Sequence, residues 1–274
     1  MKKFLVFIMA LMTVMTLALV GCDSNGQQST EQGLDPNAPK SSPFAFQGNV
    51  VALEAVIDGY NNDALWQDPN RVEVQFANCE VTIVRRPTAV YLFYKVYDVT
   101  PYRFVATGDA DEVTKSDSIE FYFDSQLNRA NVPSGNCYQV NLGRDGRTRI
   151  LAGATNSFDK WLALYNFEVR EGDFNNGDYD YYYVEAVVPA AQMNMTADNA
   201  IGIAFGQVDR VDERNVDLQK YYTWTGIVYK GNFVDPQIPS TYVVLSPVSL
   251  ISGEPNRLYT YDEYCSLTGK GGKA

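Results

Sequence analysis

Residues 116–125 read SDSIEFYFDS, a pattern that is typical of a β-strand. Successive side chains of a strand point to opposite faces, so Ile119, Phe121 and Phe123 share one face. The other face carries Ser118, Glu120, Tyr122 and Asp124. The first face suits a protein core. Two carboxylates around a tyrosine on the second face could be solvated strand polarity, a sugar-binding surface, part of a cation site or a catalytic pair.

Similar short segments, rich in β-branched and aromatic residues, recur along the chain and are separated by turn sequences such as Asp-Pro-Asn and Val-Pro-Ser-Gly. The expected strands are 72–76, 81–85, 89–99, 118–124, 138–142, 148–151, 162–169, 181–188, 201–208, 222–229 and 241–245. Residues 141–147 (NLGRDGR) predict a hairpin with Asp-Gly at its tip.

Helical periodicity is weak throughout the sequence. No segment keeps an apolar 3.6-residue period for three turns, and the nearest are short pieces at 62–67 and 190–195. The sequence therefore predicts an all-β fold, an antiparallel, jelly-roll-like β-sandwich with few short helices.

The N-terminus has the pattern of a secretory signal. Met1-Lys2-Lys3 is basic, residues 4–20 are uncharged and mostly apolar, and Leu-Val-Gly-Cys at 19–22 resembles a bacterial lipobox. The resemblance implies a signal peptide at 1–21 and lipidation of Cys22. A plain transmembrane anchor, the alternative, needs ~20 apolar residues and does not explain the cysteine.

The remaining chain divides into a tether and a domain. Residues 22–43 carry the lipidated cysteine and a polar, flexible tether, and residues 44–274 are long enough for one large β domain. We therefore expect a lipoprotein anchored to a membrane of a bacterial cell envelope, facing the periplasm or the cell exterior. The sequence leaves open which membrane holds it.

Composition narrows the possible chemistry. The chain has a net charge of −11, and loss of Lys2 and Lys3 with the signal brings it to −13, which disfavours nucleic acid as a partner. Histidine is absent, which removes the commonest general base and metal ligand. Cys79, Cys137 and Cys265 allow at most one disulfide among them, and its pairing stays open.

Six stretches in order resemble the family 9 carbohydrate-binding modules over about residues 50–245. They are Ile57-Asp58-Gly59 before Trp66, YLFYKVYD at 91–98, DSIEFYFD at 117–124, YQVN at 138–141, YYYVEAVVP at 181–189 and IGIAFGQVD at 201–209. The resemblance implies a β-sandwich that holds poly- or oligosaccharides, often the ends of glucan or xylan chains, and contains structural calcium. Acidic stretches at 107–112 and 172–178 are calcium candidates, although neither has EF-hand spacing; solvated acidic loops are the alternative.

The same resemblance gives substrate-binding residues. Trp224 is similar in position to one of two tryptophans that clamp a sugar ring, and Glu120 matches the acidic residue of the D-S-x-E stretch. Gln139, which stands where the family has arginine, Asn141 and Gln207 complete the set. The chain departs from the family at 111–115, where the second clamp tryptophan is replaced by a stretch without an aromatic residue. Trp66 and Trp161 are expected in the core.

Three functions remain open from the sequence. The first is a lipid-anchored, non-catalytic carbohydrate-binding protein. The second is a catalytic carbohydrate-active protein, which the spacing disfavours because Glu120 and Asp124 lie about 13 Å apart along a strand, whereas glycosidase carboxyl groups lie about 5 to 9.5 Å apart. The third is a structural or adaptor lipoprotein that has lost sugar binding.

Overall fold

The computed structural model describes the residues that follow, with side chains except where noted. They are 43–46, 49–76, 78–98, 113, 117–153, 158–160, 166–171, 174–175, 178–179, 181–210, 219–224 and 237–270. Only the backbone is described for 43–46, 49–52, 158–160, 166–168, 171, 174–175, 178–179, 210 and 219–224. The predicted signal peptide, Cys22, the acidic stretch 107–112, Trp161 and the side chains of 172–178 lie outside the described residues.

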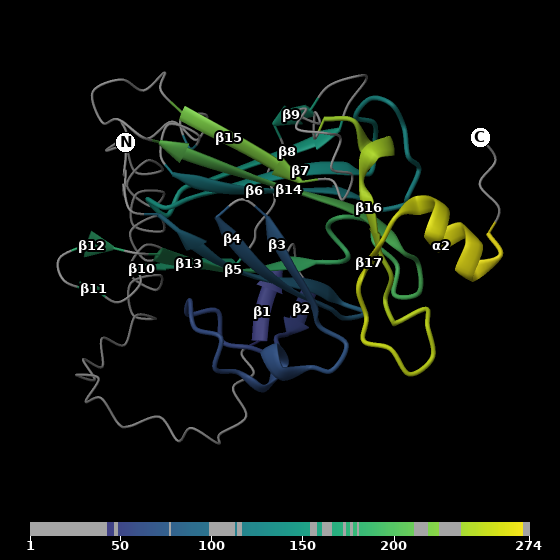
Figure 1. Ribbon diagram of the computed structural model, residues 1–274, viewed down its shortest axis with the longest axis horizontal. Coiled ribbons are helices and arrows are strands. Elements are labelled where there is room, and N and C mark those ends of the chain that lie inside the picture. The colour runs from purple at the N-terminus through teal and green to yellow at the C-terminus, as the bar shows by residue number, and fades with distance from the viewer. Residues whose placement is uncertain are drawn as a thin grey trace, which may run out of the picture. The chain divides into compact units, whose positions relative to one another are not determined.

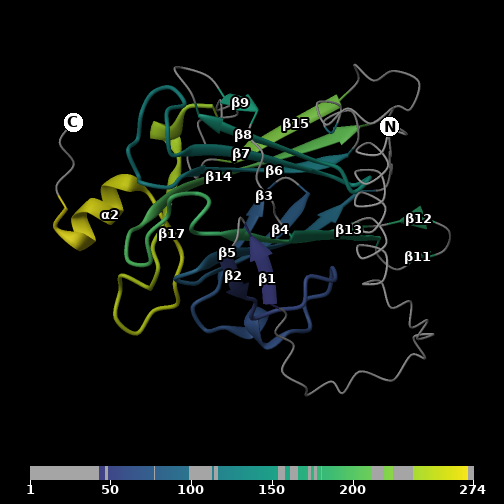
Figure 2. The same ribbon diagram turned by 180° about the vertical axis from the view of Figure 1, so that it is seen from behind.

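Two antiparallel sheets face each other (Figures 1 and 2). The small sheet has the order β10 (Asn166–Glu171), β13 (Tyr181–Pro189), β5 (Ala89–Tyr97), β4 (Cys79–Arg85) and β3 (Val72–Phe76). The large sheet has the order β17 (Leu258–Tyr259), β16 (Val243–Leu245), β14 (Ile201–Arg210), β6 (Ser118–Asp124), β7 (Cys137–Gly143), β8 (Thr148–Gly153) and β9 (Phe158–Lys160), with β15 (Gln219–Trp224) also paired to β14. The predicted all-β antiparallel sandwich is confirmed, and these strands belong to one unit, Lys40–Ala274.

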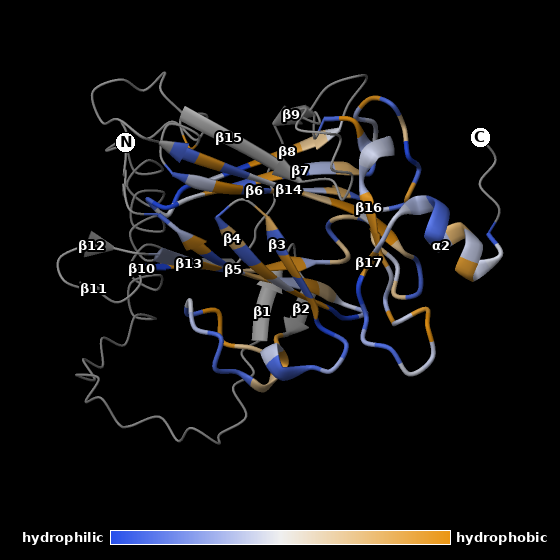
Figure 3. Ribbon diagram, in the orientation of Figure 1, coloured by the Kyte–Doolittle hydropathy of each residue, from blue (hydrophilic) through white to orange (hydrophobic). Residues whose placement is uncertain are grey.

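The main core lies between the two sheets. Ile119, Phe121 and Phe123 of β6 are fully buried there, against residues of the small sheet such as Leu92 and Val184. The alternation of hydrophobic and hydrophilic residues along β3, β4 and β14 is visible in Figure 3. This alternation lets each strand turn one set of side chains to the core, as the opening stretch predicts.

A second apolar cluster covers the outer face of the small sheet. Leu53, Leu65 and Trp66 pack there on Phe93 and other residues of β4, β5 and β13. Trp66 is 3% exposed, with its ring 5.5 Å from that of Phe93, which confirms the prediction that it is a core residue. The segment before β3 therefore acts as a third layer over part of this sheet.

Helical structure is sparse among the described residues. Residues 64–67 form a short 3-10 helix, η1 (Ala64–Gln67), and a second, η3 (Pro239–Thr241), precedes β16. Residues 190–194 form hydrogen-bonded turns instead of a helix. Helix α2 (Tyr261–Thr268) was not predicted from the sequence. Among the described residues, every helix is too short or too polar to span a membrane.

Short pairs and turns complete the described structure. β1 (Pro43–Phe46) pairs with β2 (Asn49–Ala52), and β11 (Phe174–Asn175) pairs with β12 (Asp178–Tyr179). The predicted hairpin joins β7 to β8, where the Gly143 N–H donates to the Arg147 carbonyl at 2.8 Å and Gly146 has φ 82°. The turn requires a positive φ at this position, which explains why a glycine stands there.

The three described cysteines are free thiols. Cys79 and Cys137 are buried and Cys265 is half-buried. Burial raises the pKa of the Cys79 thiol, which stays protonated and donates to Gln207 Oε1 at 3.2 Å. No disulfide forms among these three residues.

Candidate functional site

The face of the large sheet that points away from the core is polar at its centre. Glu120 and Tyr122 alternate with the core residues of β6, and they pair across to Asn141 and Gln139 of β7. Directly paired residues point to the same face, so these four side chains form one group. All four are buried, with exposed fractions of 0% for Asn141 and 6% for Gln139. The structure thus brings together three of the predicted site residues, Glu120, Gln139 and Asn141.

Hydrogen bonds hold this group in place. Tyr122 Oη donates to Glu120 Oε2 at 2.5 Å, and Asn141 Nδ2 donates to Glu120 Oε1. Gln139 Nε2 donates to Tyr122 Oη at 3.1 Å. The carboxylate is therefore fixed through both oxygens, and the group is a preorganised set of planar polar side chains.

Among the described residues, this face has buried polar atoms without a hydrogen-bond partner. Asn141 Oδ1 and Ser118 Oγ have no partner among the described residues. An unsatisfied buried polar atom costs about 1 to 3 kcal/mol, so a native protein usually has a reason to keep one. Glu120 also lies beside Gly206 of β14, which has no side chain to fill the space at that position. Asn141 Oδ1 is thus a buried acceptor without a donor among the described residues, and a hydroxyl group has the chemistry to satisfy it.

Gln207 lies on the opposite face of the sheet. It follows Gly206 by one residue, so its side chain points into the core with Phe205, where it is 1% exposed and accepts from Cys79 Sγ. The structure therefore does not place the predicted residue Gln207 beside Glu120. Alternation along β14 is the physical reason.

The remaining predicted site residue is Trp224, at the end of β15. Its backbone pairs with Phe205, whereas Glu120 pairs with Gly206. The two positions therefore lie opposite consecutive residues of β14. Only the backbone of Trp224 is described. Its proposed role as a sugar-stacking ring stays a prediction.

Asp124 has a local structural role. Its Oδ2 accepts from the Arg129 backbone N–H at 2.6 Å, which holds the turn after β6. Burial raises the pKa of this carboxyl, while backbone N–H donors, including that of Arg129, act in the opposite direction. The Asp124 carboxylate is thus engaged with its own turn, and it does not form a pair with Glu120.

A second group of charged residues lies where strands of both sheets end. The carboxylates of Asp98, Asp117 and Asp209 have oxygen atoms within 4.8 Å of one another, and all three residues are buried. Arg144 Nη1 contacts Asp98 Oδ2 at 2.8 Å and Asp117 Oδ2 at 3.3 Å. Among the described residues, three carboxylates face one guanidinium here, and carboxylate oxygens are the ligands that calcium prefers. These residues could hold a divalent cation.

Sequence reasoning missed this carboxylate cluster. Each aspartate stands at the end of a predicted strand, Asp98 after β5, Asp117 before β6 and Asp209 near the end of β14. The pairing of Ser118 with Val208 brings Asp117 close to Asp209, and this register could in principle be inferred. The position of Asp98 depends on how the two sheets stack, which a single sequence does not reveal.

Comparison with known proteins gave structural matches alone. No family model and no curated protein matches the sequence. A family 9 carbohydrate-binding module from Caldicellulosiruptor kristjanssonii in complex with cellotriose is 15% identical with a TM-score of 0.47, over 68% of this chain and 86% of that chain. Its glucose complex gives 15% and 0.47, over 70% and 90%.

A protein from Bacteroides uniformis whose proposed role is carbohydrate binding is 16% identical, with a TM-score of 0.46, over 64% of this chain and 85% of that chain. With so few identical residues and such TM-scores, the likeness assigns no ligand to this chain.

Proposed function

We propose that this chain is a non-catalytic carbohydrate-binding protein whose site is the polar group on the outer face of the large sheet. The observation that carries the proposal is the buried Asn141 Oδ1, which has no donor among the described residues. Sugar hydroxyls both donate and accept hydrogen bonds, so one hydroxyl can donate to Asn141 while its neighbour bonds to Gln139.

The hydrogen bonds of the site favour binding over hydrolysis. Glu120 receives donors at both carboxylate oxygens, and Asp124 accepts from the turn that follows β6. A glycosidase needs one carboxyl group as acid and a second as base or nucleophile, about 5 to 9.5 Å away. Release of reducing sugar by the purified chain would overturn the non-catalytic proposal.

A glycan array with the full chain is the first test, because it identifies the ligand. For the best glycan, Asn141→Ala should weaken affinity by about tenfold, the effect of losing one hydrogen bond to a ligand of roughly 1.4 kcal/mol. The measurement is calorimetry at neutral pH, with thermal melting to confirm that each variant is folded.

Asn256 provides the matched control. It is also a buried asparagine, 5% exposed, but its Nδ2 donates to the Ser246 carbonyl far along the chain from β6 and β7. Asn256→Ala should lower the melting temperature and leave glycan affinity unchanged. Equal affinity losses in both variants, or an array without any bound glycan, would leave the adaptor as the better proposal.

Trp224→Ala tests the stacking ring with the same glycan. If the ring stacks on a sugar, the substitution should remove about 2 kcal/mol or more of binding with little change in melting temperature. A core tryptophan would instead cost about 3 to 5 kcal/mol of stability. These two patterns separate a stacking ring from a packing residue.

We also propose that the chain is a lipoprotein of the bacterial cell envelope. The lipobox-like Leu-Val-Gly-Cys at 19–22 supports this, and Cys22 is the acylated residue. Cys22→Ser should abolish incorporation of a labelled fatty acid. A labelled mature form in that variant would refute the assignment.

We propose that calcium is the cofactor, because three buried carboxylates supply the oxygen ligands that it prefers. Asp98, Asp117 and Asp209 would hold the ion through carboxylate oxygens, and its charge would offset theirs. The ion would have a structural role, because this cluster lies at strand ends and is buried.

A further inference from the structure

Strand β3 is an edge strand of the small sheet, and Glu73 is the one charged residue along it. It pairs with β4 on one side, and no described strand pairs with its other side. Its five residues, VEVQF, keep a continuous register with β4 and include no proline, lysine or bulge. Exposed edges of this kind are templates for pairing with another chain.

Two hydrogen bonds at the ends of the β4–β5 hairpin show which backbone groups of β4 face β5. The Arg86 N–H donates to the Ala89 carbonyl, and the Tyr97 N–H donates to the Asn78 carbonyl, each at 2.8 Å. Hydrogen-bonded pairs alternate along an antiparallel ladder. The even-numbered residues of β4 therefore bond to β5, and the odd-numbered residues bond to β3.

The outward groups of β3 follow from this alternation. Val81 of β4 is odd-numbered and pairs with Val74, so the backbone of Val74 bonds to β4. Its neighbours Glu73 and Gln75 must then turn their N–H and C=O groups to the open edge. Both residues are exposed, whereas Val74 is half-buried.

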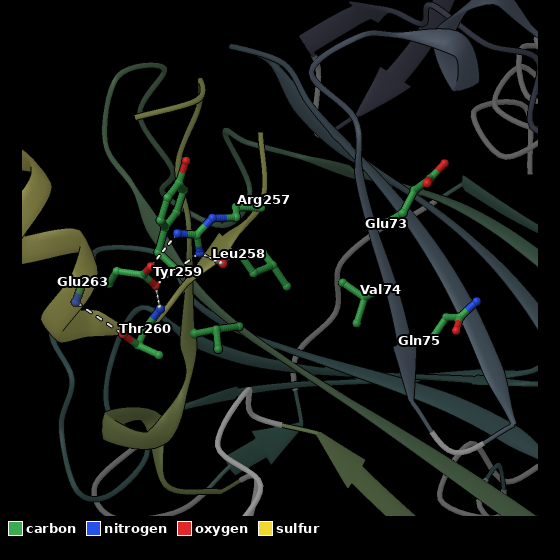
Figure 4. A pocket seen from close by; sticks show the side chains of 9 residues that line it. Glu73, Val74, Gln75, Arg257, Leu258, Tyr259, Thr260 and Glu263 are labelled. Atoms are coloured by element: carbon green, nitrogen blue, oxygen red, sulfur yellow. Dashed lines mark hydrogen bonds and ion pairs between the residues drawn. The ribbon is translucent and has the colours of Figure 1, made fainter. Parts of the chain in front are cut away.

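A groove lies beside this edge, between β3 and β17. Its volume is about 390 Å³, and its lining residues are Glu73, Val74, Gln75, Val243, Arg257, Leu258, Tyr259, Thr260 and Glu263. In Figure 4, Val74 projects toward Leu258, and the side chains of Glu73 and Gln75 extend from the opposite side of β3. Val74 and Leu258 both pack against the main core while partly exposed. Apolar side chains that pack against the core are therefore partly exposed at the edge where β3 has no neighbour among the described strands.

We propose that β3 pairs with β3 of a second copy of this chain, antiparallel, about a two-fold axis at Val74. In this register Glu73 lies opposite Gln75 of the second copy, and each such pair exchanges both N–H···O=C bonds. The carboxylate of Glu73 then meets an amide. A register centred on Glu73 would instead place two carboxylates opposite each other, which destabilises a strand pair.

The apolar side of the strand fits the same register. Val74 of each copy meets Val74 of the other on the face that borders the groove, so half-exposed apolar surface becomes covered in both copies. The interface is isologous, as expected for a two-fold dimer. Dimerisation would join two small sheets into one continuous sheet.

Cysteine cross-linking distinguishes this register from other contacts. In a non-hydrogen-bonded pair the Cα atoms lie about 4.5 Å apart, which a disulfide can span. The full chain that carries both Cys265→Ser and Val74→Cys should form a disulfide-linked dimer when membranes that contain it are oxidised. Gln75→Cys should stay monomeric, because its two copies would lie about 9 Å apart, beyond the limit of about 7 Å.

Co-production of two different cysteine variants tests the predicted pairing of Glu73 with Gln75 in the same register. Chains with Glu73→Cys and chains with Gln75→Cys should form a heterodimer when produced together, although neither cross-links alone. The chain with only Cys265→Ser shows any background from the remaining cysteines. Equal cross-linking of Val74→Cys and Gln75→Cys, or an adduct of Val74→Cys with a different protein, would overturn the proposal.

Association without a cross-link is the second readout. The solubilised full chain should double its sedimenting mass with rising concentration, and Gln75→Pro should abolish this. Proline removes an N–H that faces the open edge, so the β3–β4 ladder and the melting temperature should be preserved. A wild-type chain that stays monomeric throughout, or a dimer that survives Gln75→Pro, would contradict pairing through β3.

Discussion

At the scale of single residues, Glu185 of β13 ties the N-terminal layer to the small sheet. Its Oε2 accepts from the backbone N–H groups of Asp58 and Gly59, each at 2.8 Å, and its Oε1 accepts from Trp66 Nε1 at 3.1 Å. The side chain is fully buried. One carboxyl group thus holds the Ile57-Asp58-Gly59 segment and the core tryptophan in place.

This carboxyl should make stability depend on pH. Burial raises the pKa of Glu185 to about 7, with the charge of Asp58 adding to the rise and the three donors opposing it. The folded state then binds the proton more tightly than the unfolded state. The resulting stability, roughly 3 kcal/mol, is complete below about pH 4.5 and is lost as pH rises through about 7.

Glu185→Gln should remove this pH dependence. The amide nitrogen introduced by this substitution must face at least one of the three N–H donors. We therefore also expect the free energy of unfolding to fall by about 1 to 3 kcal/mol at low pH. The measurement is the urea midpoint between pH 4.5 and 8. Glu54→Gln is the control, because Glu54 is half-exposed and paired with Arg86 on the surface. If the urea midpoint of Glu185→Gln changed with pH as much as that of the wild-type chain, another group would be responsible for the pH dependence.

At the scale of elements, the strands were predictable because their alternation is a local property. The stretch SDSIEFYFDS forms β6 at the expected residues, 118–124, and β3 also has the expected bounds. At their described ends, β10 reaches 171 and β15 begins at 219, each beyond the predicted ranges 162–169 and 222–229, whose other ends lie outside the described residues. Among the added paired residues, Arg170-Glu171 and Gln219-Lys220 are polar, so aromatic and β-branched content did not mark them as part of a strand.

Helix α2 shows a local signal that was available in the sequence. Thr260 accepts from the Glu263 N–H at 3.3 Å, and the Glu263 side chain accepts from the Thr260 N–H at 3.3 Å. This is the Thr-x-x-Glu capping box, and Gly269 ends the helix with φ 67°. The helix is eight residues long, too short for a test that requires three turns of apolar period.

The candidate site was predictable to the extent that it follows from alternation. Glu120 and Asn141 both fall on the non-core face of their strands, and the structure pairs them. The same rule applied to Ile201, Ile203 and Phe205 would have assigned Gln207 to the core face, against the family resemblance. Pairing of β6 with β7 rather than with another strand is a long-range property, which the sequence pattern alone does not determine.

At the scale of the whole molecule, the carboxylate cluster links the two sheets. Asp98 follows β5 of the small sheet. In the large sheet, Asp209 lies in β14, Asp117 directly precedes β6 and Arg144 directly follows β7. The side chain of Arg144 is fully buried, and its guanidinium lies 4.5 Å from the ring centre of Tyr182, a core residue of the small sheet. Charge balance in this cluster should therefore affect the stability of the entire sandwich.

Arg144→Met tests this link. Removing the cation leaves three buried carboxylates close together, so we expect a loss of roughly 3 to 5 kcal/mol in the free energy of unfolding, measured with urea in the presence of a chelator. Arg257→Met is the control, because Arg257 forms an exposed pair with Glu263 and should cost less than about 1 kcal/mol.

Calcium should partly restore stability to Arg144→Met. Among the described residues, the variant's cluster keeps three carboxylates and loses the Arg144 guanidinium, so a divalent cation would offset more negative charge there than in the wild-type chain. Added calcium should therefore raise the melting temperature of both proteins, and of Arg144→Met by more. Asp117→Asn removes one ligand and should reduce the response in either background. A melting temperature insensitive to calcium in all these chains would contradict the calcium assignment, while a large loss in Arg144→Met would still support the role of Arg144 in joining the sheets.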